Sequence, residues 1–548
     1  MSSRDDLFAT AEAWLAAEPD DDIRVELATL VQQARTSEVA FDDLADRFDG
    51  RLQFGTAGLR AAVAAGATRM NRLVVRQAAA GLGRWLLDQE ASGAIQDAAR
   101  RGVVIAHDAR RKSDVFALDT ARVLAHMGVR SMLHPGVQPT PVLAGSITGL
   151  EAAAGVVVTA SHNPPADNGY KVFLAAGSQI VSPIDAEIAE CIDRFDPLTV
   201  ELAQEDDHLI RRLDLSWQEA YVADVPSVRL RPDVAGVPVA YTAMHGVGAE
   251  TIELAFAAAG FDTPIPVVEQ HLPDGTFPTV SFPNPEEPGA MDRLLEVAAE
   301  SGAHLALAND PDADRLGVAI PQPDGSWRRL TGDEIGWLFA EHILSNTEGD
   351  DRLVVTTLVS SSMLSRLAAE HGVHSEETFT GFKWIGKIAA ERAESGQRFV
   401  FGYEQALGYL VASRPLDKDG ITAAVLMAEI AACAEADGTT LQARLDALAE
   451  RFGRYVTAEV SVRMDPSDAR AWVESIEQSP PDSVGGRAVE SVSTYPEADL
   501  VRLVLEGGVR LQVRPSGTEP KVKLYGEAID MDPEVLSDLL TALAPSTA

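Results

Sequence analysis

The sequence is poor in cysteine and in positive charge. Only Cys191 and Cys433 are present among 548 residues, with no CxxC or Cys/His spacing. This excludes a disulfide framework or a cysteine-based zinc site, so both cysteines are expected in the core. Acidic residues outnumber basic ones by 83 to 46, which gives a formal net charge of −37. Such a chain is not expected to bind nucleic acid or an anionic membrane, because these partners need a basic surface.

The sequence also lacks a hydrophobic run long enough to cross a bilayer. Its first fifteen residues contain Asp5, Asp6 and Glu12, which a secretory signal would avoid. We therefore expect a cytoplasmic protein that does not bind membranes. The oligomeric state is not predicted by any feature of the sequence.

A chain of 548 residues is too long for one hydrophobic core and predicts several domains. Short apolar runs followed by helical patterns recur three times from residue 103 onward, which predicts an α/β class. The last hundred residues instead contain paired strand patterns with a turn at Gly507-Gly508, which predicts a smaller α+β domain. The expected segments are a helical lead-in at 1–48, α/β domains at 49–210, 211–325 and 326–450, and the α+β domain at 451–548.

Lysine is the rarer basic residue, with seven in the chain. An ammonium group is a compact charge whose pKa shifts readily, which suits it to proton transfer and phosphate binding. A chain that otherwise uses arginine therefore draws attention to the lysines that it keeps. Five of them fall in unusual loop sequences, namely Lys171, Lys383, Lys418, Lys521 and Lys523.

The first candidate site is the segment TASHNPPADNGYKVF at 159–173, which follows an apolar strand pattern ending at Val158. It places Ser161 and His162 at the carboxyl end of a strand, where α/β sheets bind their ligands. A single serine is usually a turn residue. The adjacent His162 and the nearby Lys171 favour a nucleophile.

The second candidate site is NDPDADR at 309–315, after the apolar run 305–308. Asp310, Asp312 and Asp314 alternate, which suits a hard cation such as Mg²⁺ or Ca²⁺. An EF-hand is excluded because its sixth and twelfth positions would be Arg315 and Pro321 rather than glycine and glutamate. An acidic surface turn is the alternative, but three carboxylates without a counterion would repel one another.

The third candidate site is RPSGTEPKVKLY at 514–525, a loop expected between two strands. Its side-chain donors and the backbone N–H groups around Gly517 suit a phosphate dianion. So many donors in an acidic chain favour phosphate binding over a plain hairpin. The donors are Arg514, Ser516, Thr518 and Lys523.

The fourth candidate site is GYEQALGY at 402–409, in which Glu404 can accept hydrogen bonds from two sugar hydroxyls. A solvated loop carboxylate is the alternative. Lys418 is expected just before a helix that begins near Gly420, and Lys383 in a glycine-flanked turn. Both lysines are candidates to meet a phosphate or a hydroxyl.

Five motifs in this order resemble the α-D-phosphohexomutase family, which includes phosphoglucomutases and phosphomannomutases. They are FGTAGLR, TASHNP, DPDADR, GYEQALGY and RPSGTEPK, and the resemblance runs from Arg51 to Tyr525. The segments TGFKWIG and PNPEE resemble the branch with phosphopentomutase-like and glucose-1,6-bisphosphate-forming members. The resemblance implies three related α/β domains with mixed sheets and a fourth domain with an antiparallel sheet, around one central cleft.

The resemblance also implies a role for each candidate residue. Ser161 would be the phosphoserine and, with the three aspartates, would bind Mg²⁺. Arg60 and Arg315 would neutralise the transferred phosphoryl group, and Glu404 would hold sugar hydroxyls. The base that takes the sugar proton is left open among His162, Lys171 and Lys418. Lys383 is a further substrate-binding candidate, and the distal phosphate would be held by Arg514, Ser516, Gly517, Thr518 and Lys523.

The expected activity is interconversion of a sugar 1-phosphate and 6-phosphate, with a sugar 1,6-bisphosphate as intermediate and activator. Glucose is the first choice of sugar, with mannose and pentose as alternatives. The choice is open because the loop has Gln405 and lacks a serine that many hexose-specific members place there. A metal-dependent sugar phosphatase and a non-catalytic sugar-phosphate sensor are the competing classes. A kinase is set aside because the chain has no GxxxxGK[ST] loop.

Overall fold

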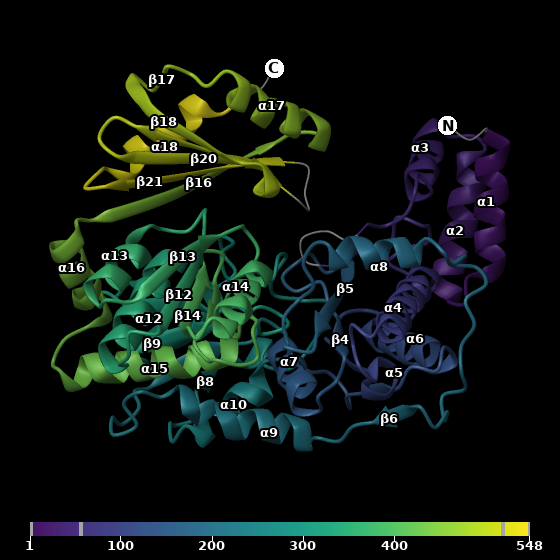
Figure 1. Ribbon diagram of the computed structural model, residues 1–548, viewed down its shortest axis with the longest axis horizontal. Coiled ribbons are helices and arrows are strands. Elements are labelled where there is room, and N and C mark those ends of the chain that lie inside the picture. Colours follow the sequence, from purple (N-terminus) through teal and green to yellow (C-terminus); the bar gives the residue numbers. More distant parts are fainter. Residues whose placement is uncertain (1–3, 54–57, 517–520, 546–548) are drawn as a thin grey trace. The chain divides into compact units, whose positions relative to one another are not determined.

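Short apolar segments form strands, and the amphipathic segments between them form helices (Figure 1). The computed structural model describes residues 4–53, 58–516 and 521–545. Contacts within the chain divide it into two units. The first comprises 1–229, 235–328 and 410–428, and the second comprises 230–234, 329–409 and 429–548.

The chain begins with three helices, as the sequence predicts: α1 (Arg4–Ala17), α2 (Asp21–Ala34) and α3 (Glu38–Arg47). Their apolar sides share one core cluster with the start of α4 (Arg72–Ser92). This cluster includes Trp14 of α1, which is buried. The lead-in therefore packs against α4, the first helix of the α/β region that follows it.

The first sheet has the order β1-β5-β4-β2-β3-β6. Its β4, β2, β3 and β6 are parallel, whereas β5 is antiparallel to both β1 and β4, so the sheet is mixed. The strands are β1 (Leu59–Ala62), β2 (Val103–His107), β3 (Ser131–Leu133), β4 (Ala154–Val158), β5 (Asp167–Leu174) and β6 (Ile210–Arg212). The helices are α4, α5 (Ala98–Arg101), α6 (Ser113–His126), α7 (Thr140–Gly149) and α8 (Ile184–Ile192).

Strand β2 is covered on both faces. Val103 and Ile105 join one cluster with α4 and α6, whereas Val104 and Ala106 join another with α7. Successive side chains of a strand point to opposite faces, so a central parallel strand under two helical layers must be apolar throughout. This explains the uninterrupted apolar run that the sequence shows there.

The second sheet also lies in the first unit and has the order β11-β10-β9-β7-β8. Its β9 is parallel to β7 and antiparallel to β10, so this sheet is mixed too. The strands are β7 (Val239–Thr242), β8 (Ile265–Pro266), β9 (Leu305–Ala308), β10 (Gly317–Pro321) and β11 (Trp327–Arg329). The helices are α9 (Ser216–Asp224), η1 (Val225–Val228), α10 (Ala249–Ala258), η2 (Val268–Gln270) and α11 (Asp292–Ser301).

The third sheet has the order β13-β12-β14-β15, and β12 is parallel to both β13 and β14. The strands are β12 (Arg352–Thr357), β13 (His374–Thr378), β14 (Arg398–Glu404) and β15 (Gly408–Leu410). The helices are α12 (Gly332–Asn346), α13 (Met363–Glu370), α14 (Phe382–Glu394), α15 (Gly420–Ala436) and α16 (Leu441–Phe452).

The fourth sheet, order β16-β21-β20-β19-β18-β17, is antiparallel, as predicted for the last hundred residues. Gly507 and Gly508 form the β19–β20 turn, both with positive φ, which confirms the predicted hairpin. The strands are β16 (Tyr455–Arg463), β17 (Ser483–Val484), β18 (Arg487–Tyr495), β19 (Leu500–Leu505), β20 (Val509–Pro515) and β21 (Lys521–Ile529). The helices are α17 (Pro466–Gln478), η3 (Pro496–Ala498) and α18 (Pro533–Leu543).

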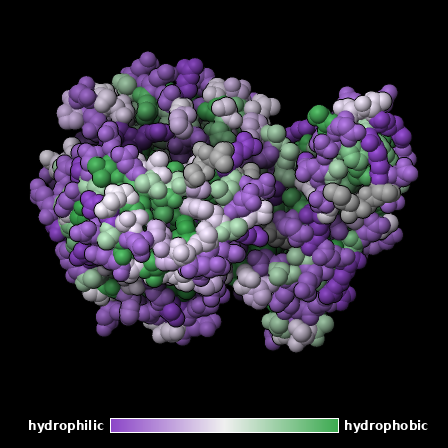
Figure 2. Space-filling view, turned by 90° about the horizontal axis from the view of Figure 1, so that it is seen from above, coloured by the Kyte–Doolittle hydropathy of each residue, from purple (hydrophilic) through white to green (hydrophobic). Residues whose placement is uncertain are grey.

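The surface agrees with the polar composition of the chain. Hydrophilic residues cover most of the face in Figure 2, with hydrophobic residues in smaller patches between them. Within the described part of the chain, no helix is both long and apolar enough to cross a membrane. The exact domain boundaries and the central cleft stay predictions.

The lead-in contains a buried acid, Glu18, whose side chain is 1% exposed. Burial, with a contribution from the Asp20 carboxylate, raises the pKa of Glu18 to about 7. The folded state thus holds a proton that the unfolded chain has already lost above its ordinary carboxyl pKa. The free energy of unfolding should fall as pH rises from that ordinary value to about 7.

We therefore expect Glu18→Gln to be more stable than the wild type at pH 8, by about 3 kcal/mol, and equally stable at pH 4. Urea unfolding at the two pH values measures this. Glu12→Gln is the control because Glu12 lies on α1 and is exposed. Equal pH dependence in all three proteins would contradict the expectation.

Candidate active site

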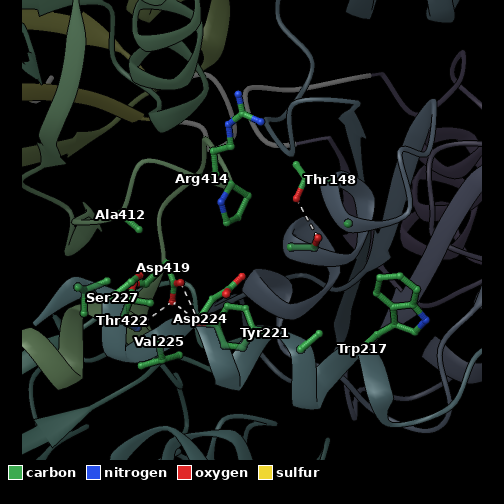
Figure 3. A pocket seen from close by; sticks show the side chains of 15 residues that line it. Thr148, Trp217, Tyr221, Asp224, Val225, Ser227, Ala412, Arg414, Asp419 and Thr422 are labelled. Atoms are coloured by element: carbon green, nitrogen blue, oxygen red, sulfur yellow. Dashed lines mark hydrogen bonds between the residues drawn. The ribbon is translucent and has the colours of Figure 1, made fainter. Parts of the chain in front are cut away.

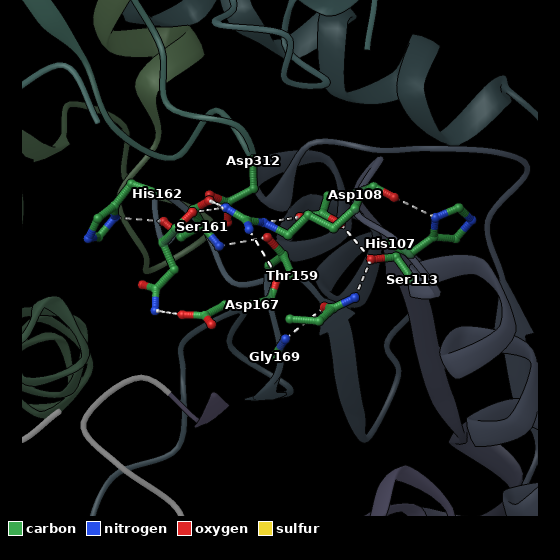
Figure 4. Close-up of polar contacts among 12 residues, drawn as sticks. His107, Asp108, Ser113, Thr159, Ser161, His162, Asp167, Gly169 and Asp312 are labelled. Carbon is green, nitrogen blue, oxygen red and sulfur yellow. Dashed lines mark hydrogen bonds and ion pairs between the residues drawn. The ribbon is translucent and has the colours of Figure 1, made fainter. Parts of the chain in front are cut away.

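Ser161 lies just beyond the carboxyl end of β4 and is buried. Its Oγ lies 2.7 Å from Asp310 Oδ2, to which it donates, and 3.1 Å from His162 Nδ1. Its backbone N–H donates to Thr159 Oγ1 at 2.8 Å. The predicted nucleophile thus contacts one of the three predicted metal ligands. Figure 4 shows Ser161 beside His162 and Thr159.

A glycine lets the two ends of this loop approach closely. A Cβ at Gly169 would lie 2.5 Å from Thr159 O, which is too close for any other residue. Gly169 pairs with Arg60 across β5 and β1. Arg60 is thereby held beside the loop and donates from Nη1 to Asn163 Oδ1 at 3.2 Å.

Asp310, Asp312 and Asp314 follow β9 and are fully buried. Each offers an oxygen within 4.8 Å of the others, a spacing that a single metal ion can bridge. The backbone N–H of Arg315 donates to Asp310 Oδ1 at 3.0 Å and so turns this carboxylate into the site. The spacing that the sequence predicts is therefore present as a cluster.

Two buried lysines reach this cluster. Lys171 Nζ lies 2.6 Å from Asp312 Oδ2 and 2.9 Å from Asp314 Oδ2, and Lys418 Nζ lies 2.7 Å from Asp314 Oδ2. Lys171 stands on strand β5 rather than in a loop, because β5 begins earlier, at Asp167. That strand is antiparallel to β4, and Lys171 pairs with Val157. The lysine therefore lies close to the end of β4 from which Ser161 extends.

Charge balance in the cluster separates the three carboxyl groups. Burial, with the Asp314 and Asp312 charges, raises the pKa of Asp310 well above its usual range. Burial opposes ionisation of Asp314 as well, but Lys171 and Lys418 outweigh it and lower the pKa of that carboxyl. The two lysines thus compensate charge on one side of the cluster.

The base candidates also differ in their charge. Burial, with the charges of Arg315 and Arg60, holds the pKa of the His162 imidazole well below its usual value. Burial also opposes the charge on Lys418, but Asp314 and Asp417 outweigh it and raise the pKa of that amine. His162 is therefore neutral and Lys418 charged near pH 7.

Lys418 is placed by the start of α15. The next residue, Asp419, accepts hydrogen bonds from the backbone N–H of Ile421 and Thr422 at 2.9 and 3.1 Å. Tyr221 of α9 donates to the same carboxylate at 2.8 Å. Asp419 and Tyr221 line a separate pocket of about 310 Å³ (Figure 3), where none of the predicted site residues is found.

Thr140, at the start of α7, was not among the predicted residues. Its Oγ1 donates to Asp312 Oδ2 at 2.6 Å and its N–H donates to Asp312 O at 3.0 Å. The signal for it is the segment Pro139–Pro141, which follows β3 at the same carboxyl edge of the sheet. Thr140 thus joins α7 of the first sheet to the aspartate loop, residues 309–314 after β9.

The other predicted residues lie in the second unit. Glu404 ends β14 and its Oε1 accepts a hydrogen bond from the Gly381 N–H at 3.1 Å. Lys383 lies in the first turn of helix α14 and not in a turn, which corrects the prediction. The helix forms because Phe382, Ile385 and Ala389 recur at helical spacing and are buried.

The predicted phosphate loop is shorter than expected because the flanking strands extend into it. Arg514 belongs to β20 and Lys523 to β21, where they are directly paired. Lys523 Nζ lies 2.7 Å from Glu459 Oε1. Ser516 follows β20 and its N–H donates to Lys521 O at 2.9 Å. Gly517 and Thr518 lie outside the described residues.

Comparison with known families covers most of the chain. The phosphoglucomutase/phosphomannomutase α/β/α domain I matches residues 51–198, domain II matches 219–325 and domain III matches 331–452. The C-terminal domain of the same family matches 459–543.

Individual relatives carry several names. A Haemophilus influenzae protein named "Probable phosphomannomutase" is 41% identical, with 85% of this chain and 94% of that protein covered. The human phosphopentomutase is 33% identical (92% and 89% covered), and the human glucose 1,6-bisphosphate synthase 32% (94% and 88%). A solved phosphoglucomutase/phosphomannomutase family structure from Burkholderia thailandensis has a TM-score of 0.67 at 21% identity, with 89% and 95% covered.

The fold and the family matches define an isomerase-class phosphotransferase, a phosphomutase with α/β domains and a C-terminal antiparallel sheet. The chain belongs to the phosphoglucomutase/phosphomannomutase family, the α-D-phosphohexomutases. This confirms the resemblance read from the motifs, including the branch, because the relatives' names include phosphopentomutase and glucose 1,6-bisphosphate synthase.

Thr140 provides a test of how the aspartate loop is held. We expect Thr140→Val to weaken binding of a divalent cation about ten-fold, since a residue that orients a metal ligand typically contributes this much. Titration calorimetry with Mg²⁺ measures it. Thr148→Val is the matched control, because Thr148 lies on the same helix and its hydroxyl donates to Gly145 O of its own turn. Equal affinities would show that Asp312 does not need the threonine.

Proposed function

We propose that the protein interconverts glucose 1-phosphate and glucose 6-phosphate through a phosphorylated Ser161 and glucose 1,6-bisphosphate. The observation that carries this proposal is the contact of Ser161 Oγ with Asp310 at 2.7 Å, inside a buried cluster of three aspartates. A nucleophilic hydroxyl against a candidate metal site is what phosphoryl transfer through an enzyme intermediate requires. Membership of the mutase family supports the same chemistry.

We propose that Mg²⁺ is held by Asp310, Asp312, Asp314 and an oxygen of the phosphorylated Ser161. The donor set fits, because oxygen ligands are those that Mg²⁺ prefers. Asp312 Oδ1 and Asp314 Oδ1 are also buried without a hydrogen-bond partner among the described residues. When bound, the ion would neutralise charge on the phosphoryl oxygens.

His162 is our choice for the base. Its Nδ1 lies 3.1 Å from Ser161 Oγ, whereas the amines of Lys171 and Lys418 donate to aspartates. The sugar hydroxyl attacks phosphorus while the bond to Ser161 Oγ breaks. His162 takes the hydroxyl proton and returns it to Ser161 Oγ. Neither the attacking sugar oxygen nor Ser161 Oγ is then left with a negative charge.

The arginines near the serine would stabilise the group in transit. Arg60 contacts the serine loop, residues 159–167 between β4 and the start of β5, through Asn163. Arg315 directly follows the aspartate loop. Both are fixed by backbone pairing or loop geometry, so little reorganisation accompanies the reaction. The reverse transfer needs the bisphosphate to turn over, which puts its other phosphate at Ser161.

The residues of the second unit are proposed to bind the sugar and its other phosphate. Glu404 would accept sugar hydroxyls. A phosphate at Lys523 would compete with the Glu459 carboxylate, 2.7 Å away. The remaining proposed ligands are Lys383, Arg514, Ser516, Gly517 and Thr518.

The choice of sugar rests on the names of the family and of its members. The family description combines phosphoglucomutase and phosphomannomutase, which favours a hexose. The names of individual relatives support mannose and pentose phosphates about equally well. We retain glucose as the proposal and treat the other two sugars as outcomes of the test.

The test is a coupled assay with glucose 1-phosphate, Mg²⁺ and a catalytic amount of glucose 1,6-bisphosphate, beside mannose 1-phosphate and ribose 1-phosphate. We expect glucose to give the highest kcat/KM, and Ser161→Ala to abolish turnover of all three sugars. Ser92→Ala, at the exposed end of α4, is the control for a serine-to-alanine change. Preference for another sugar would replace glucose within the same mechanism, whereas release of free phosphate would indicate a phosphatase. No turnover with any of the three sugars would favour a non-catalytic sugar-phosphate sensor.

Removal of divalent cations tests the metal separately. Dialysis against EDTA should abolish turnover and addition of Mg²⁺ should restore it, because the phosphoryl charge would otherwise meet the aspartates. Asp312→Asn should raise the Mg²⁺ concentration needed for half-maximal activity. Full activity in EDTA would contradict the role given to the three aspartates.

A further inference from the structure

Arg110 lies in the turn between β2 and α6 and has no part in the chemistry described above. It is 3% exposed. Its guanidinium donates to four backbone carbonyls of the serine loop. Nη2 lies 2.6 Å from both Ser161 O and Asn163 O, and Nη1 lies 2.7 Å from Pro164 O and 3.0 Å from Asp167 O.

The serine loop uses an outside donor, Arg110, for the carbonyls of Ser161, Asn163 and Asp167. Ser161 has φ +51, a left-handed conformation that residues other than glycine adopt at a cost. Pro164 and Pro165 have no N–H to contribute to internal hydrogen bonds. The buried Ser161 carbonyl needs a partner, and the planar guanidinium supplies it. The same group also donates to the other three carbonyls, of which Pro164 O accepts a second hydrogen bond from the Asp167 N–H at 3.0 Å.

Arg110 is itself fixed from two sides. Asp108 Oδ2 lies 3.3 Å from Arg110 Nε, and Asp108 Oδ1 accepts hydrogen bonds from the Arg110 N–H at 2.9 Å and from Ser113 Oγ at 2.6 Å. Figure 4 shows Asp108 and Ser113 next to each other. The guanidinium also lies 4.9 Å from the ring centre of Phe277, which lies in the segment 219–325 that matches domain II of the family.

The segment that carries Phe277 lies close to the backbone beside Arg110. A Cβ at Gly275 would lie 2.3 Å from Ala109 O, so only glycine lets the segment carrying Phe277 reach the arginine. The guanidinium is therefore enclosed by the serine loop, Asp108 and Phe277. A side chain so enclosed has little freedom to move with the loop.

We propose that Arg110 is a positioning residue that holds the serine loop so that Ser161 Oγ faces Asp310 in the geometry needed for phosphoryl transfer. It acts through the loop backbone and does not touch the sugar. This inference rests on the proposed role of Ser161 as phosphoryl carrier. It makes a distinct demand, because loss of Arg110 should slow transfer while leaving binding of the sugar phosphate intact.

The test compares wild type, Arg110→Lys and Arg111→Lys. One reaction measured is phosphorylation of Ser161 by glucose 1,6-bisphosphate in a single turnover, followed by intact mass. Steady-state kcat and KM are measured beside it, well below each melting temperature. Arg111 is the matched control, because it is next to Arg110 in the sequence and its side chain donates to Asp22 of α2 and not to the serine loop.

In Arg110→Lys we expect Ser161 to be phosphorylated at least about 30-fold more slowly, with KM within about three-fold of the wild type. An ammonium group cannot bridge four carbonyls, and a small displacement of a reacting atom slows the reaction strongly. Arg111→Lys should match the wild type. Phe277→Leu removes the ring from the guanidinium and should slow the same step about 3- to 10-fold. It decides the question if the lysine variant does not fold.

Unchanged transfer in Arg110→Lys, or in Phe277→Leu where the lysine variant is unfolded, would overturn the inference. So would a rise in KM as large as the fall in kcat, because a general loss of structure would produce it. A wild-type protein that never accepts phosphate on Ser161 would instead remove the proposed function, and with it this inference.

Discussion

The structure of the site depends on compensating the charge of three carboxylates that are buried beside one another. Asp310, Asp312 and Asp314 lie within 4.8 Å, in surroundings where like charges repel strongly. Two lysines compensate part of this charge. Lys171 comes from β5 of the first sheet and Lys418 from the start of α15, so elements far apart in sequence must pack correctly before the aspartates can be buried.

The compensation is incomplete in a way that suits a metal and a phosphate. Three carboxylates face two ammonium groups, and oxygens of Asp312 and Asp314 have no hydrogen-bond partner among the described residues. Because two ammonium groups leave one negative charge, a dication would make the cluster net positive, which would favour an added phosphate group. Arg60 and Arg315 add positive charge close to the same aspartates.

Backbone geometry is the second requirement for this site. Ser161 leaves the strand in a left-handed conformation, and its loop returns as β5 through Gly169, where only glycine fits. Arg110 donates to the carbonyls of this loop. Thr140 of α7 donates to Asp312 and so connects the aspartate loop to the first sheet and its helices. Contacts from the first and second domains therefore converge on one serine and one aspartate loop.

The sequence by itself determined where the candidate site residues lie along the chain and which family the chain resembles. Strand patterns ending at Val158 and Ala308 place Ser161 and the aspartates at strand ends, and five ordered motifs identify the family. These signals are local, because a strand's alternation and a loop's composition are written in neighbouring residues. Local patterns also misplaced boundaries: Lys383 proved helical, and Lys171, Arg514 and Lys523 proved to lie on strands.

Only the tertiary structure decided which of these residues meet. Arg110 and Thr140 resemble ordinary turn and helix-start residues in the sequence, and their partners lie 51 and 172 positions away. The same holds for Lys418 and Asp314, which are 104 positions apart. Pairing across such distances follows from sheet order and domain packing, which depend on the burial of apolar surface from the whole domain and leave no mark on any single segment.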